Sequence, residues 1–248
     1  MGPAEVAAPL APPWRPWPRR SRADVIFLPG ERQAAERISR RWFQRTLQPC
    51  EYAGLAGAPD DAVVEVGVLN GRLYIELGGP RAAYRAHSYL FRKRRILVLL
   101  NDGFHIHVRP MQNQGLGLQI FHRQVHNAAA LGVGRIETVG GRQARENGYY
   151  TWPRFGFDGA LPASIRRILP LGLEGSRSVL DLMRCEKGRA WWREHGATIR
   201  VAFALARGSR SRRALAQYVH ERMAADKIAS GPKRNLEIRR ETCYSIAR

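Results

Sequence analysis

The sequence predicts an α/β (α+β) protein with a mixed, mostly antiparallel central sheet, flanking helices and a C-terminal α/β extension. Two tight-turn signals, Asn70-Gly71 and Asn101-Asp102-Gly103, each separate two apolar runs. An Asn-Gly or Asp-Gly pair in that setting is the strongest short hairpin signal. Further along, from Leu116, the apolar period changes from strand type to helix type. Consecutive strands followed by a helix and another strand suit a mixed sheet.

The N-terminal half supplies most of the predicted strands. A short strand over residues 25–28 precedes a helix from about Glu31 to Leu47, whose inward side chains we expect to be Ala34, Ile38, Trp42 and Phe43. Two hairpins follow, which pair residues 62–69 with 72–77 and residues 96–100 with 104–108. Between these hairpins lies a segment that ends in Arg92-Lys93-Arg94-Arg95, which reads either as a solvated loop or helix end, or as a phosphate site.

The rest of the chain is organised around residues 104–157. The alternating run Phe104–Val108 ends at Arg109-Pro110, and a polar loop leads into a helix that begins at Leu116. A second strand covers residues 135–139, and the stretch closes on an aromatic segment over residues 149–157, which we expect to be strand-like. Beyond it, the pattern predicts short helices at 163–169 and 176–183, a helix end at Gly196, a strand at 198–205 and a helix capped by Ser209.

The loop before the helix has the features of an anion cradle. The first N–H groups of a helix lack intrahelical partners, and the helix dipole places partial positive charge there. Gly115 and Gly117 carry no Cβ, so a phosphate can approach the backbone closely. The alternative is a strand–turn–helix joint whose glycines only ease a tight turn.

The order Gln-x-x-Gly-x-Gly after a strand, then a helix, a strand and an aromatic segment ending in Gly-Phe, resembles the acyl-CoA-binding core of the GNAT N-acetyltransferases. The resemblance covers about 50 residues around the loop and implies a GNAT-like fold that binds acetyl-CoA, or another acyl-CoA, as co-substrate. In that family the loop holds the coenzyme A pyrophosphate, and the preceding strand flanks the pantetheine arm. The matching cofactor-binding residues are Ile106, Val108, Gln112, Asn113, Gln114, Gly115, Leu116 and Gly117.

The resemblance also implies candidate catalytic residues. Trp152 stands where the family usually has a tyrosine that serves as general acid, and indole has no titratable proton to give. The proton for the leaving thiolate is therefore assigned to Tyr150, or next to Tyr149, and the base that deprotonates the amine to Glu137. The alternatives are that the tyrosines are packing residues and that Glu137 faces solvent.

The charge of the chain points to anionic partners. The formal net charge is +20, from 41 basic and 21 acidic residues, which would attract RNA, another polyanion or a nucleotide cofactor. All but four of the basic residues are arginine, and such a bias is also produced by genomic base composition. The function that we predict is an N-acyltransferase acting on an unidentified amine. The alternative is a catalytically inactive GNAT-like fold that binds nucleic acid or protein.

Four segments describe the expected organisation. Residues 1–23 form a disordered tail rich in Pro and Arg, 24–160 the GNAT-like domain, 161–225 an extension packed on it, and 226–248 a basic tail. No apolar run is long enough to cross a membrane, and three widely spaced cysteines suggest a reducing cytoplasm. The pairs His105/His107 and His122/His126 lack a completing carboxylate or cysteine, so no metal is predicted.

Overall fold

A seven-stranded sheet in the order β1-β2-β3-β4-β5-β6-β7 forms the centre of the protein. The computed structural model describes Pro18 and residues 20–112, 114–143 and 146–229. Neighbouring strands are antiparallel except β1–β2 and β5–β6, which are parallel. The predicted class, a mixed and mostly antiparallel sheet flanked by helices, is confirmed. The strands are β1 (Asp24–Phe27), β2 (Val63–Leu69), β3 (Arg72–Gly78), β4 (Tyr84–Lys93), β5 (Ile96–Ile106), β6 (Val133–Gly140) and β7 (Ile199–Ala204).

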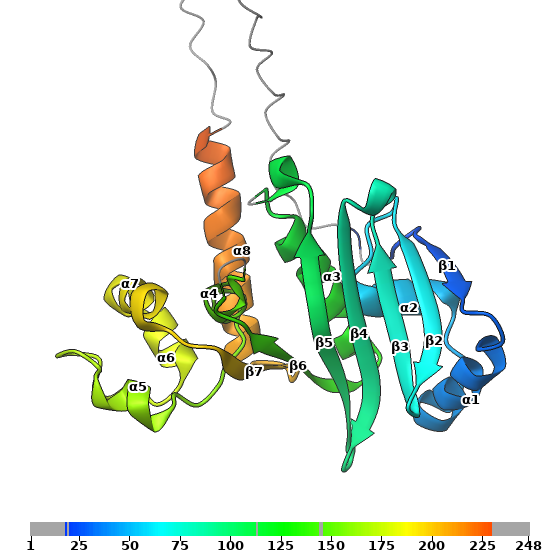
Figure 1. The fold of residues 1–248 in the computed structure, drawn as a ribbon, viewed down its shortest axis with the longest axis horizontal. Helices are drawn as coiled ribbons and strands as arrows, with labels where there is room; N and C mark the ends of the chain where they lie inside the picture. The colour runs from blue at the N-terminus through cyan, green and yellow to red at the C-terminus, as the bar shows by residue number, and fades with distance from the viewer. Residues whose placement is uncertain (1–17, 19, 113, 144–145, 230–248) are drawn as a thin grey trace, which may run out of the picture.

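The helices pack on one face of this sheet and beyond its β7 edge. Figure 1 shows α2 and α3 behind strands β2–β5, and α5, α6 and α7 gathered at the opposite end from β1. In the part of the chain that the structure describes, no helix is long and apolar enough to cross a bilayer. The helices are α1 (Arg32–Phe43), α2 (Pro49–Ala56), α3 (Leu116–Ala130), α4 (Gly148–Arg154), α5 (Ala163–Arg167), α6 (Val179–Met183), α7 (Glu186–His195) and α8 (Arg210–Ala229), with 3-10 turns η1 (Pro80–Ala82) and η2 (Arg109–Met111).

The two faces of the sheet differ because side chains alternate along each strand. The helix-covered face is apolar, and on β3 it carries the buried Leu73, Ile75 and Leu77. The opposite face carries partly exposed polar and aromatic side chains, of which Tyr74 and Glu76 are examples. An antiparallel sheet tolerates such a solvated face, because its backbone groups are already paired within the sheet.

One of the two predicted hairpin turns is present. Asn70 and Gly71 join β2 to β3 with φ values of 51° and 70°, as a two-residue turn requires. The turn predicted at Asn101-Asp102-Gly103 is wrong, because β5 runs through these residues without a break. Gly103 serves packing instead: a Cβ there would lie 2.5 Å from the imidazole of His87 on β4.

The real turn between β4 and β5 lies in the basic run. Arg94 adopts a left-handed φ of 57°, and Arg92–Arg95 are all exposed around it. The basic run is therefore a solvated turn, one of the two alternatives considered for it, whereas strand β4, which leads into it from Tyr84, was not predicted. The register between β4 and β5 shifts by one residue further along: His87 pairs with Gly103 and Ser88 with Asn101, so Asp102 is the extra residue of a β-bulge in β5.

The first helix is shorter than predicted. It ends at Phe43, because Gln44 turns left-handed with a φ of 62°, and a second helix, α2, starts at Pro49. Proline favours the first helical position, and a capping box between Gln48 and Glu51 closes that end. The inward residues predicted on α1 are only partly buried, whereas the fully buried ones are Ala35 and Ser39.

The C-terminal segments form the predicted elements: the two short helices and the strand are shorter than predicted, whereas α8 continues to Ala229, past the start of the expected tail at residue 226. Helix α7 stops at His195 before Gly196, and the Ser209 hydroxyl caps α8 by accepting a hydrogen bond from the Arg212 N–H at 3.2 Å. Strand β7 pairs antiparallel with β6, so the C-terminal third adds the last strand of the same sheet.

Candidate functional site

Strands β5 and β6 separate at the middle of the sheet. They pair in parallel from Leu97 and Val133 up to Asn101 and Thr138, where their pairing ends. Beyond that point, β5 continues to Ile106 against β4, whereas β6 continues to Gly140 against β7. The two parallel strands therefore diverge, and each exposes a backbone edge toward the gap.

A buried hydrogen-bond network fixes the point of divergence. The Thr138 hydroxyl donates to the Asn101 carbonyl at 2.8 Å, and the Asn101 amide donates to Gln124 of α3 at 2.8 Å. Ser88 donates to the Asn101 side-chain oxygen at 2.9 Å, and the Gln124 amide donates to the Leu55 carbonyl at 2.8 Å. Buried polar groups that satisfy one another hold a single geometry, because each broken bond leaves an unpaired group.

The glycine loop lies against the diverging half of β5. Gly115 is the N-cap of α3 with a left-handed φ of 87°, and a Cβ on Gly117 would lie 3.2 Å from the Phe104 ring on β5. The Gln112 side chain donates to the Ile106 carbonyl at 2.8 Å, which closes the loop onto the strand end. The structure therefore brings together three of the predicted cofactor-binding elements: the end of β5, the glycine loop and the start of α3.

The remaining predicted cofactor-binding residues fall in the same region. Gln114 is exposed, Leu116 is the first residue of α3, and Val108 is exposed just past the end of β5, which stops at Ile106 and not at Val108. Asn113 lies outside the described residues.

A small cavity of about 20 Å³ lies between the diverging half of β5, α3 and α4. Its wall includes Gly103, Phe104, Gly117, Gln124 and Trp152. This volume suffices for about one water molecule. Trp152 is fixed here by aromatic contacts, with its ring centroid 6.0 Å from that of Phe121. The sequence prediction did not identify this cavity, because its walls come from six separate elements, namely α2, α3, α4, β3, β4 and β5.

The tyrosine pair lies on a helix and not before a strand, so that part of the sequence prediction is wrong. Gly148–Arg154 form α4, whose first turn is bonded to the end of β6 through the Tyr149 N–H and the Gly141 carbonyl at 3.1 Å. Pro153 has no N–H to donate to the Tyr149 carbonyl one turn earlier, and the Trp192 indole N–H donates to that carbonyl instead, at 2.9 Å.

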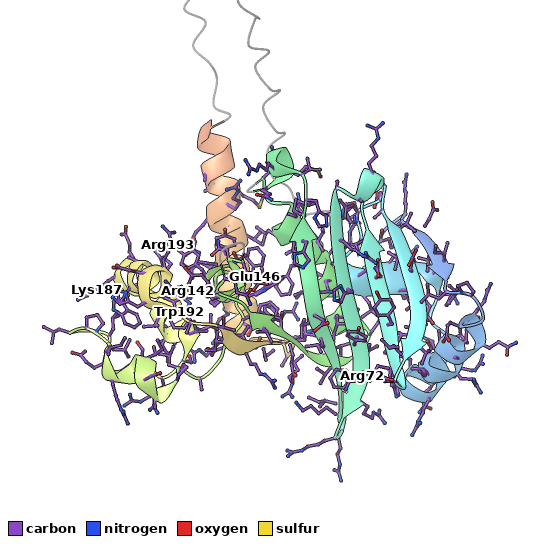
Figure 2. The ribbon with its side chains drawn as sticks, viewed as in Figure 1. Arg72, Arg142, Glu146, Lys187, Trp192 and Arg193 are labelled. Carbon is purple, nitrogen blue, oxygen red and sulfur yellow. The ribbon has the colours of Figure 1, made fainter. Side chains whose placement is uncertain are left out.

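Both phenol groups meet α7. The Tyr149 hydroxyl donates to the Arg193 carbonyl at 2.7 Å, so its proton is already engaged. The Tyr150 hydroxyl accepts from the Arg193 guanidinium at 2.9 Å, so its own proton is left to donate elsewhere. Figure 2 shows Arg142, Trp192 and Arg193 around this part of α4, and the Trp192 indole donates to the Tyr149 carbonyl at 2.9 Å. Residues of α7 therefore position the tyrosines, a role that the sequence did not reveal.

Glu137 lies on β6 next to the point of divergence. Its carboxylate contacts Arg135 at 2.5 Å and Lys93 at 3.7 Å. Its strand neighbours Ile136 and Thr138 are buried toward the helices, so Glu137 lies on the opposite, solvated face of the sheet.

The histidine pairs form no metal site in the part of the chain that the structure describes, where no three His, Cys, Asp or Glu side chains converge. The imidazole rings of His105 and His107 are stacked, with their centroids 6.2 Å apart. On α3, the ring centroids of His122 and His126 lie 4.6 Å apart. Burial, together with the neighbouring His126, lowers the pKa of His122 to about 4, so this imidazole is neutral at pH 7.

Comparison of the chain with models of known protein families and with curated proteins finds no match.

Proposed function

We propose that the protein is an N-acyltransferase that moves an acyl group, in the first instance acetyl, from acyl-CoA to an amine. The observation that carries the proposal is the divergence of parallel strands β5 and β6 directly beside the glycine start of α3. The GNAT N-acetyltransferases, which the loop sequence resembles, also splay two central strands at their acyl-CoA site.

Each part of the proposed site has a chemical task. The N–H groups at the start of α3 would bind the pyrophosphate, because they have no helical partners and lie at the positive end of the helix dipole. The Gln112 N–H would not take part, because it already donates to the Arg109 carbonyl at 3.0 Å. The pantetheine arm would follow the free edge of β5 near Ile106 and Val108. A backbone N–H in the gap would polarise the thioester carbonyl.

Proton transfer completes the reaction. Glu137 would accept the proton of the amine, directly or through water, from the solvated face of the sheet. The amine nitrogen then bonds to the acyl carbon, the carbon–sulfur bond breaks, and the thiolate takes a proton from Tyr150, whose hydroxyl proton is not engaged by Arg193. The Trp152 ring leaves no proton donor at its own position, which is why the proposal depends on Tyr150.

The test is calorimetric titration of acetyl-CoA into the parent protein and into Gly115→Asp and Gly115→Asn. Asn and Asp have the same shape and both tolerate the left-handed backbone at this N-cap, so the pair isolates charge. A carboxylate about 5 Å from a phosphate, at an effective dielectric constant of about 20, raises the binding free energy by about 3 kcal/mol.

Gly115→Asp should therefore bind acetyl-CoA about 100-fold more weakly than Gly115→Asn. Equal affinities would show that the loop does not hold the pyrophosphate. A parent protein that does not bind acetyl-CoA would refute the function itself. Turnover is then measured as release of the coenzyme A thiol with a panel of amines.

A further inference from the structure

A second, larger cavity of about 280 Å³ lies outside the proposed acyl-CoA site, between α4, α6, α7 and α8. Five arginines line it, and we name it the arginine pocket: Arg154, Arg184, Arg189, Arg210 and Arg213. The elements that bring these arginines together are far apart in the sequence, so their convergence is a product of the fold.

Two of the five charges are neutralised by carboxylates. Arg154 pairs with Glu221 at 3.4 Å, and Arg210 pairs with Asp181 at 2.6 Å and with Asp158 at 3.5 Å. These pairs hold the walls of the pocket together. Because two arginines face three carboxylates, the pairs carry a formal net charge of −1 and offset one of the other three arginine charges.

Arg184, Arg189 and Arg213 have no carboxylate partner within ion-pair distance among the residues that the structure describes. Arg189 donates to the Met183 carbonyl at 3.0 Å, and Arg213 donates to the Gly208 carbonyl. These two bonds fix the side chains and leave their charge uncompensated. Three positive charges that form no ion pair within the described residues therefore line one concave space, in which Arg189 is partly buried and Arg184 and Arg213 are exposed.

The shape and chemistry of the pocket define what would neutralise it. Guanidinium groups match phosphate oxygens with paired N–H donors, which makes arginine the usual residue for bidentate phosphate recognition. The volume is just below the range of roughly 300–1,000 Å³ that is typical for small-molecule sites, so the ligand is compact. Leu180, Met183 and Tyr218 supply an apolar wall for an organic part.

We propose that the arginine pocket binds the phosphate group of a small organic phosphate, with Arg184, Arg189 and Arg213 contacting its oxygens. The site is separate from the acyl-CoA site and does not depend on acyl transfer. Helix α4 lies between the two: Trp152 lines the small cavity beside β5, whereas Pro153 and Arg154 line the arginine pocket.

The experiment is calorimetric titration of the full chain at low salt with inorganic phosphate, AMP and adenosine. AMP should bind more tightly than inorganic phosphate, and adenosine should not bind. Arg184→Gln removes one unpaired charge without breaking a hydrogen bond within the described residues, and should weaken AMP binding about 10- to 100-fold. The matched control is Arg166→Gln on the exposed surface of α5, which removes the same charge and should leave the affinity within about twofold.

Cross-testing separates this site from the glycine loop. Gly115→Asp should leave AMP binding unchanged, and Arg184→Gln should leave acetyl-CoA binding unchanged. Loss of AMP binding in Gly115→Asp but not in Arg184→Gln would place the phosphate in the loop and overturn the proposal. Failure of both AMP and inorganic phosphate to bind would also overturn it.

An RNA 12-mer distinguishes a local site from general surface charge. If its 5′-phosphorylated form displaces AMP and the unphosphorylated form does not, the pocket recognises a phosphate at the end of RNA. If Arg184→Gln and Arg166→Gln lower the affinity for AMP equally, net surface charge explains the binding, and the arginine pocket is not a binding site.

Discussion

The buried amide network at the divergence of β5 and β6 gives the sharpest stability prediction. Gln124 on α3 is 4% exposed, donates to the Leu55 carbonyl at 2.8 Å and accepts from the Asn101 amide at 2.8 Å. Gln124→Met keeps the length of the side chain and removes both of its polar groups. The Leu55 carbonyl and one Asn101 N–H then lose their partners inside the protein.

The magnitude follows from these two groups. Each unsatisfied buried group costs roughly 1–3 kcal/mol. The adjacent cavity of about 20 Å³ has room for about one water molecule, which would satisfy one of them. We therefore expect the free energy of unfolding to fall by about 3 kcal/mol, which for a chain of this length lowers Tm by about 6–12 °C.

Urea denaturation followed by circular dichroism, together with differential scanning calorimetry, measures the loss. The control is Gln33→Met on the exposed surface of α1, which should change the unfolding free energy by no more than about 0.5 kcal/mol. A loss below about 1 kcal/mol for Gln124→Met would refute the reasoning, because the two groups would then have found other partners.

The remaining predictions concern catalysis, a turn and pH. Tyr150→Phe keeps the ring and removes the proton, so kcat should fall about 100- to 10,000-fold at unchanged acetyl-CoA affinity; an unchanged kcat in steady-state assays would assign thiolate protonation to solvent. Gly71→Ala places a Cβ at a φ of 70° and should lower the urea-derived unfolding free energy by about 1–2 kcal/mol. Gly175→Ala, where a Cβ meets nothing within 4 Å, is the control, and an equal loss there would contradict the turn argument. His122 has its pKa lowered from 6.5 to about 4 by burial and by His126, so the unfolded state binds more protons between these values. The free energy of unfolding should therefore fall as pH drops from about 6.5 to about 4, and urea titrations of His122→Gln should show a weaker pH dependence. The same pH dependence in the parent and in His122→Gln would contradict this assignment to His122.

The local signals in the sequence were sufficient for the class of the fold. The Asn70-Gly71 turn, the helical period from Leu116 and the alternation at residues 198–205 each depend on neighbours in the chain, and each element is present. Turn geometry and side-chain periodicity are properties of short segments, so a single sequence carries them.

Where a distant contact decided the conformation, the local signal failed. Asn101-Asp102-Gly103 has the composition of a turn, but Ser88 and Gln124 bind Asn101 and the His87 ring packs on Gly103, so the segment stays extended. Tertiary packing overrides local preference when it supplies hydrogen bonds and burial that a turn cannot supply.

The candidate sites likewise contain a part that the sequence predicts and a part that only the fold brings together. The residues of the glycine loop adjoin one another in the chain, and the sequence alone placed them before a helix. The fold alone brought Trp152 of α4 against that loop, set Arg193 of α7 on the tyrosine pair, and gathered the arginines of α4, α6, α7 and α8 around one cavity. A spacing in the sequence can encode neighbours on one element, but the meeting of separate elements depends on how their apolar faces pack, which only the tertiary structure determines.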